Sequence, residues 1–157
     1  MQRRAGFTLL ELIVVIAVIA IIAGIGIPNL ITWRNNVKIR GATNNLRGDM
    51  ELAKMKAIRE NAYVVVQFAS DEYTIFVDDG EGGATAGDWS RTGDELLVIN
   101  RQLSGVTIDL GSTTFNNDRT RFDGRGLPGN WGTVVITDSI GNQRQISLSL
   151  VGRLNVQ

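Results

Sequence analysis

The chain has 157 residues, of which 16 are basic and 16 acidic, so its formal net charge is zero, and it contains neither cysteine nor histidine. The absence of these two residue types excludes Cys/His zinc sites, histidine general bases, and Cys–His or Ser–His nucleophilic sites. Balanced charge does not predict a nucleic-acid or anionic-membrane partner, and the length allows one modest globular domain beyond an anchor.

The apolar run at residues 7–28 is the dominant feature of the sequence, and only Thr8 and Glu11 interrupt it. As a helix, a run of this length covers about 30 Å, the thickness of the hydrocarbon core of a bilayer. A carboxylate in a spanning segment costs about 2.5–3.5 kcal/mol on insertion scales and is normally kept where it meets a partner. The sequence therefore predicts a membrane-spanning helix in which Glu11 has a function.

Three ordinary explanations compete for this run. A cleaved secretory signal usually has an apolar core of about 7–15 residues that ends at a small-residue cleavage site, whereas this run is longer and ends in Gly24 to Pro28. A twin-arginine export signal is suggested by Arg3-Arg4, although two arginines before an apolar run are common. A plain anchor fits the length and the basic flank but gives Glu11 no role.

Residues 3–11, Arg-Arg-Ala-Gly-Phe-Thr-Leu-Leu-Glu, resemble the class III signal of type IV pilins and pseudopilins. The resemblance implies that a prepilin peptidase removes residues 1–6 by cleavage between Gly6 and Phe7, and that the new amine of Phe7 is N-methylated. It also implies that the helix is kept as membrane anchor and later as filament core. In this family an acid placed like Glu11, about one turn beyond Phe7, is thought to pair with the terminal amine of a neighbouring subunit. The alternative is a carboxylate that reaches back to the membrane interface.

Residues 29–60 predict a more polar continuation of the helix. Its apolar residues recur at steps of three or four and predict a stripe that packs on the globular domain: Ile39, Ala42, Leu46, Met50, Ala53 and Ala57. Gly24, Gly26 and Pro28 lie just before it and predict either a simple kink or a segment that loosens on assembly.

Beyond residue 60, short β-branched and aromatic runs alternate with turn residues and predict antiparallel strands. The predicted strands are 63–68, 73–77, 96–99, 106–110, 133–137 and 145–150. The last one alternates apolar and polar residues, which predicts one buried and one solvated face. The predicted fold is α+β and pilin-like, with a long helix packed on an antiparallel sheet domain. The predicted division is a cleaved leader 1–6, a transmembrane or filament-core helix 7–28, an amphipathic half 29–60 and a β-rich domain 61–157.

The long loop of residues 78–95 is rich in acidic side chains: Asp78, Asp79, Glu81, Asp88, Asp94 and Glu95. Calcium takes several oxygen ligands, but the spacing does not match an EF-hand loop. The family resemblance places the calcium site of major pseudopilins in a different, C-terminal loop. A solvated acidic loop is therefore the favoured interpretation, calcium binding stays open, and no metal or other cofactor is predicted.

The C-terminal half contains a loop from Phe122 to Gly126, a Gly141-Asn142 hairpin and a terminal strand ending in Gly152-Arg153. These patterns are similar to those of the GspH/FimT branch of pseudopilins. The resemblance implies a structural, non-enzymatic subunit: a minor pseudopilin of the periplasmic pseudopilus of a type II secretion system. The alternative is a minor pilin of a type IV pilus, for pilus assembly or DNA uptake. Expected partners are other pseudopilins or pilins through the N-terminal helix, prepilin peptidase and the bacterial inner membrane, which the chain would cross once with its domain in the periplasm.

DNA binding and catalysis are both disfavoured by the residues that would have to carry them. In DNA-binding FimT-like proteins the resemblance points to a C-terminal Gly-Arg-x-Arg element, of which this chain keeps Arg153 and has Asn155 at the second arginine position. Further phosphate contacts could come from Arg119, Arg121, Arg125 and Arg144, diluted by Asp118, Asp123 and Asp138. A solvated strand end is favoured for Arg153, and nucleic acid is not an expected partner. Adjacent acids such as Asp78 and Asp79 have no fixed geometry for acid–base work, so no catalytic residue is expected.

Overall fold

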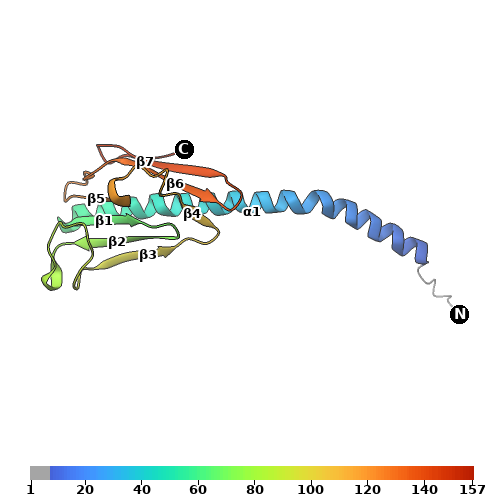
Figure 1. The fold of residues 1–157 in the computed structure, drawn as a ribbon, viewed down its shortest axis with the longest axis horizontal. Helices are drawn as coiled ribbons and strands as arrows, with labels where there is room; N and C mark the ends of the chain where they lie inside the picture. The colour runs from blue at the N-terminus through green and yellow to red at the C-terminus, as the bar shows by residue number, and fades with distance from the viewer. Residues whose placement is uncertain (1–7) are drawn as a thin grey trace. The chain divides into compact units, whose positions relative to one another are not determined.

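The computed structural model describes residues 8–157, which form one long helix followed by eight strands and two short 3₁₀ turns (Figure 1). Helix α1 runs from Leu9 to Glu60 without interruption, with Pro28 in its interior. The chain divides into two compact units, one that ends at Arg34 and one that comprises Asn35–Gln157, and the division falls inside α1.

The second unit contains two four-stranded antiparallel sheets, with strand orders β3-β2-β1-β5 and β4-β6-β7-β8. The strands are β1 (Tyr63–Phe68), β2 (Glu72–Asp78), β3 (Leu97–Gln102), β4 (Val106–Ile108), β5 (Arg119–Phe122), β6 (Gly132–Asp138), β7 (Gln143–Leu148) and β8 (Leu154–Val156). The fold class expected from the sequence, a long N-terminal helix packed on an antiparallel β domain, is confirmed.

One hydrophobic core joins α1 to both sheets. The helix contributes Ile39, Leu46, Met50, Ala53 and Ala57, each at most 2% exposed, with Ala42 partly buried beside them. The sheets contribute alternate residues of their inner faces, among them Val64, Val66 and Ile75 from the first and Val134, Ile136 and Ile146 from the second. The stripe predicted from the helical period is therefore the stripe that the core buries.

The two sheets are also tied together by backbone hydrogen bonds at the turn between β1 and β2. The amide of Ile108 donates to the carbonyl of Ser70 at 2.8 Å, and the amide of Leu103 donates to the carbonyl of Asp71 at 2.7 Å. These contacts fix the start of the second sheet against the turn that leads into β2 of the first.

The strand predicted at residues 145–150 ends earlier than expected, and the terminal strand lies later. Strand β7 stops at Leu148, Leu150 is 60% exposed, and the last strand, β8, begins at Leu154. Gly152 adopts φ +74°, a conformation that favours glycine, and its amide donates to the carbonyl of Ser149 at 2.9 Å. This turn reverses the chain where the alternating pattern predicted a continuing strand.

Candidate assembly site and partner surfaces

The start of α1 contains the predicted assembly residue Glu11, whereas Gly6 and Phe7, the predicted processing residues, lie outside the described residues. The hydroxyl of Thr8 accepts a hydrogen bond from the amide of Glu11 at 3.2 Å, and the carbonyl of Thr8 accepts one from the amide of Leu12 at 3.2 Å. Thr8 is thus the N-cap, in the Thr-x-x-Glu spacing of a capping box. This capping role was not predicted from the sequence, although the spacing was available to indicate it.

The side chain of Glu11 is exposed, and within residues 8–157 it forms no ion pair. Its position in the first turn of α1 places it at the end of the helix where the backbone amides favour a negative charge. A cationic group from another chain would find the carboxylate accessible there.

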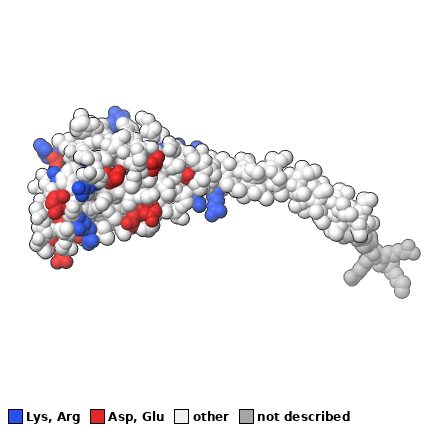
Figure 2. Space-filling model, viewed as in Figure 1, with Lys and Arg blue, Asp and Glu red and all other residues white. Residues whose placement is uncertain are grey.

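The apolar part of α1 has no partner within the described chain. Its large hydrophobic side chains range from 48% exposed at Val15 to 76% exposed at Leu9. This is the one helix of the described chain that is long and apolar enough to cross a membrane, by length and composition. Figure 2 shows no charged side chain on the visible surface of the described segment that precedes the domain. Such a surface is stable in lipid or against other apolar helices.

A polar cluster ties the second half of α1 to the first sheet. The buried hydroxyl of Tyr73 donates to Oδ2 of Asp49 at 2.5 Å, and Nε of Arg101 donates to the same oxygen at 2.8 Å. Burial, followed by the negative charge and hydrogen bond of Asp49, raises the pKa of Tyr73 above its ordinary value. The phenol therefore remains a donor throughout the neutral range and holds the helix at a fixed position on β2 and β3.

Two acids of the 78–95 loop organise the loop itself. Asp78 and Glu95 are fully buried. Asp78 accepts the amide of Gly87 at 2.6 Å and that of Trp89 at 3.0 Å, while Glu95 accepts amides of the same loop at 2.9 and 3.2 Å. The prediction of a solvated loop is wrong for these two side chains, because buried backbone amides need acceptors. In residues 8–157, no group of three or more acidic side chains is placed to hold a metal ion.

An arginine fastens the same loop to the outer face of the first sheet. The guanidinium of Arg121 lies 4.1 Å from the ring centre of Tyr63 and 4.2 Å from that of Trp89, and it donates to the carbonyl of Gly87 at 2.9 Å. Arg119 donates to the carbonyl of Trp89 at 2.6 Å. Stacked cation–π contacts and charge-assisted hydrogen bonds of this kind order a loop that contains several glycines.

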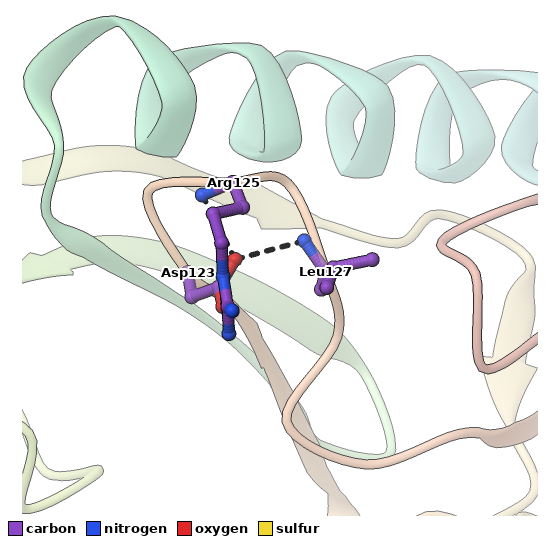
Figure 3. Close-up of polar contacts among 3 residues, drawn as sticks. All are labelled: Asp123, Arg125 and Leu127. Carbon is purple, nitrogen blue, oxygen red and sulfur yellow. Dashed lines mark hydrogen bonds and ion pairs between the residues drawn. The ribbon is translucent and has the colours of Figure 1, made fainter.

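The turn after β5 neutralises a further arginine (Figure 3). Oδ1 of Asp123 accepts the amides of Arg125 and Leu127, each at 2.9 Å, and Oδ2 pairs with the guanidinium of Arg125 at 2.8 Å. Partial burial alone would raise the pKa of Asp123, but the hydrogen bonds from the Arg125 side chain and from both amides lower it below its usual range. The carboxylate therefore stays ionised and keeps Arg125 engaged.

These contacts determine which of the arginines considered for DNA binding are available to contact a phosphate. Arg119, Arg121 and Arg125 are engaged within the domain, and Arg144 is partly buried on β7. Arg153 is exposed in the turn before β8, where Nζ of Lys54 donates to the neighbouring carbonyl of Gly152 at 2.8 Å. The structure does not bring the predicted arginines together into one free basic patch.

A groove of about 540 Å³ opens along the exposed face of α1 beside the edge strand β3. Its walls include Gly48, Leu52 and Met55 from the helix and Val98 from the strand. Met55 is 68% exposed, and a side chain placed on Gly48 would touch nothing within 4 Å. This mixed apolar face is a surface on which another subunit has room to pack.

The exposed apolar helix, its continuation through the core, and the two antiparallel sheets define the class of membrane-anchored, pilin-like subunits. The chain belongs to the family described as type II transport protein GspH, whose model matches residues 42–152. The prokaryotic N-terminal methylation motif matches residues 1–27. The family expected from residues 3–11 and from the C-terminal patterns is thereby confirmed.

Two proteins of one organism are similar to this chain in sequence. The pilin-like protein PilA1 of Thermus thermophilus is 29% identical over 173 aligned positions, which cover 99% of this chain and 100% of PilA1. The type IV wide pilus major component PilA4 of the same organism is 39% identical over 69 positions, covering 44% of this chain and 53% of PilA4.

Solved structures show the same fold at low identity. The type IV minor pilin FimU of Pseudomonas aeruginosa has a TM-score of 0.58 at 15% identity and covers 81% of this chain and 92% of the FimU chain. The minor pseudopilin EpsH of the Vibrio cholerae type 2 secretion system has a TM-score of 0.57 at 13% identity and covers 76% of this chain and 96% of the EpsH chain. Family membership implies assembly with other pilins, and the methylation motif implies a prepilin peptidase.

Proposed function

We propose that this protein is a minor pseudopilin, a structural subunit of the periplasmic pseudopilus of a type II protein secretion system. The observation that carries the proposal is α1 itself: one helix offers an exposed apolar surface at its start and the central stripe of a folded domain at its end. An anchor of that kind, which continues as a packing element, suits a subunit stored in the inner membrane and later drawn into a filament. The domain would lie in the periplasm after a single membrane crossing. The family model, described as a type II transport protein, supports the secretion assignment.

Processing at the N-terminus is part of the same proposal. Prepilin peptidase would cleave between Gly6 and Phe7, and the new amine of Phe7 would be N-methylated. The match of residues 1–27 to the methylation motif supports this site. Mass spectrometry of the protein from a host with a working peptidase should give a chain that begins at Phe7 and carries one added methyl group. A chain that retains residues 1–6, or one that begins beyond Ile27, would contradict the proposal.

Glu11 would act in assembly by pairing with the terminal amine of a neighbouring subunit. Its exposure and its lack of an ion-pair partner in residues 8–157 support this role. Glu11→Ala should insert and be cleaved normally but should fail to enter filaments, as assayed by shearing and immunoblotting. Glu81→Ala, which changes an exposed glutamate in a loop of the folded domain, is the control and should assemble. Normal assembly of Glu11→Ala would remove the assignment.

A minor pilin of a type IV pilus is the second candidate. The similarity to the wide pilus component PilA4 over 69 aligned positions, and the fold shared with the minor pilin FimU, favour it. Deletion of the gene separates the two: loss of secreted proteins from the culture medium with intact surface pili supports the secretion role. Loss of surface pili or of DNA uptake with normal secretion supports the pilus role. For DNA uptake, Arg153→Ala should then abolish low-salt binding of duplex DNA by the purified protein.

A further inference from the structure

The stretch of α1 that follows the apolar run carries one sign of charge. Between Pro28 and Asp49 the helix has no acidic residue and four basic ones, all at least partly exposed: Arg34, Lys38, Arg40 and Arg47. Within residues 8–157 none of these four forms an ion pair, whereas Lys56, Arg101 and Arg125 are all paired at 2.8 Å or less. Four unneutralised cations on one helix need a partner of opposite charge or remain exposed to water.

The helical rise sets the distance of each cation from the end of the apolar run. At ~1.5 Å per residue, Arg34, Lys38 and Arg40 lie ~9, ~15 and ~18 Å beyond Pro28, and Arg47 lies ~29 Å beyond it. Lipid headgroups occupy roughly 5–7 Å outside the hydrocarbon core, and the field of an anionic surface extends about 8–10 Å farther. Long basic side chains also reach back toward the headgroups. The first three residues therefore fall within reach of a bilayer surface, and Arg47 does not.

Two neighbouring features suit a position at such a surface. Trp33, immediately before Arg34, is 63% exposed, and tryptophan rings favour the interface between hydrocarbon and water. The side chain of Lys38 packs beside Gly105 in the turn between β3 and β4, with its ammonium close to the glycine. An ammonium held in this way loses less freedom when it binds a phosphate.

We propose that Arg34, Lys38 and Arg40 bind the phosphate-bearing headgroups of acidic phospholipids in the leaflet from which α1 emerges. The inference rests on the proposed function in one respect, because it requires residues 7–28 to span the membrane. A bilayer is next to these residues whenever the subunit waits in the membrane, and its charge is complementary to theirs. The contact would hold the unassembled subunit at a fixed depth until it enters a filament.

The test uses the full chain, reconstituted in phosphatidylcholine vesicles that contain a trace of spin-labelled phosphatidylglycerol or spin-labelled phosphatidylcholine. Electron paramagnetic resonance measures how much of each lipid is immobilised at the protein. Each cation near an anionic surface is worth a roughly fivefold preference, so the wild type should prefer phosphatidylglycerol by at least about fivefold at low salt. The preference should fall as salt is added.

The variants isolate the three residues. In Arg34→Gln/Lys38→Gln/Arg40→Gln the preference should drop toward the level that Arg3 and Arg4, present in every variant, give by themselves. Arg47→Gln is the matched control and should keep the wild-type preference. Equal preference in the wild type and the triple variant, or an equal loss in Arg47→Gln, would overturn the inference.

Two further outcomes separate this inference from its foundation. A protein that resists carbonate extraction from the vesicles but shows no lipid preference refutes the lipid contact and leaves the anchor intact. A protein that carbonate removes refutes the spanning helix and the lipid contact together.

If the triple variant keeps its lipid preference but loses cross-linking to neighbouring subunits, the basic residues serve a protein partner and the lipid assignment is wrong.

Discussion

The contact between Tyr73 and Asp49 gives the sharpest test of how α1 is held on the first sheet. Tyr73→Phe removes one hydroxyl from a fully buried ring and leaves the ring itself in place. The lost hydrogen bond, 2.5 Å long, reaches a carboxylate that still receives Nε of Arg101 at 2.8 Å. Hydrogen bonds to charged groups contribute about 1.5–3 kcal/mol, and the remaining arginine keeps the carboxylate partly satisfied, so the expected loss is about 1–2 kcal/mol.

The assay is urea unfolding of the full chain in a non-ionic detergent, followed by tryptophan fluorescence. With a slope of about 2 kcal/mol per molar urea, which is typical of a small domain, this loss lowers the midpoint by roughly 0.5–1 M. Tyr63→Phe is the matched control, because the hydroxyl of Tyr63 donates no hydrogen bond within residues 8–157 and its side chain is 39% exposed. Its free energy of unfolding should change by less than about 0.5 kcal/mol.

A double-mutant cycle identifies the partner. In an Asp49→Ala background, Tyr73→Phe should cost clearly less than in the wild type, because the acceptor is already gone. An unchanged midpoint for Tyr73→Phe, or the same loss with and without Asp49, would refute the idea that this hydrogen bond fastens the helix to the sheet.

Three further predictions concern the domain surface. Gly48→Ala should raise the free energy of unfolding by up to about 1 kcal/mol in the same urea assay, because Gly48 lies inside α1 with open space where a side chain would go; a loss of stability would contradict that geometry. Arg121→Ala should shift the emission of Trp89 to longer wavelength and cost about 1–2 kcal/mol, since stacking and a hydrogen bond to the loop are both lost; unchanged emission would show that the loop is held by other contacts. Burial opposes ionisation of Asp138, but hydrogen bonds from Asn142 and from turn amides lower its pKa, so the stability it confers is present above about pH 4 and lost as the pH falls through its folded value. Asp138→Asn should therefore be less stable than the wild type at pH 7, with a difference that shrinks below about pH 4 in pH-dependent unfolding, and a constant difference would exclude this linkage.

The helix and its buried stripe were predictable because they depend on local order. Leu46, Met50 and Ala53 recur with the helical period, and the core buries that face. The assembly and processing residues were likewise derived from nine consecutive residues, 3–11, and they stay predictions because their partners belong to other molecules.

The division into two sheets was not predictable from local pattern. Val65 pairs with Arg121, far along the chain, while the strands between them belong partly to the other sheet. The burial of Asp78 and Glu95 was not predictable for the same reason. Both acids accept hydrogen bonds from amides of the loop, and which amides come near depends on how the whole loop folds. The alternation of apolar and polar residues likewise predicted a strand that continues to Leu150, because this pattern carries no information about the turn that Gly152 permits.

The unbroken course of α1 has a mechanical consequence. Traction on the N-terminal part of the helix would reach Leu46 and Met50 in the middle of the core through the helix itself, which continues past Pro28, rather than through a flexible tether. Sliding the helix out would have to shear the apolar packing and break the ties at Asp49 and Lys54 at the same time, because the two act side by side. Contacts that are loaded in parallel share the applied force. This arrangement suits a domain on which force would act through its own N-terminal helix.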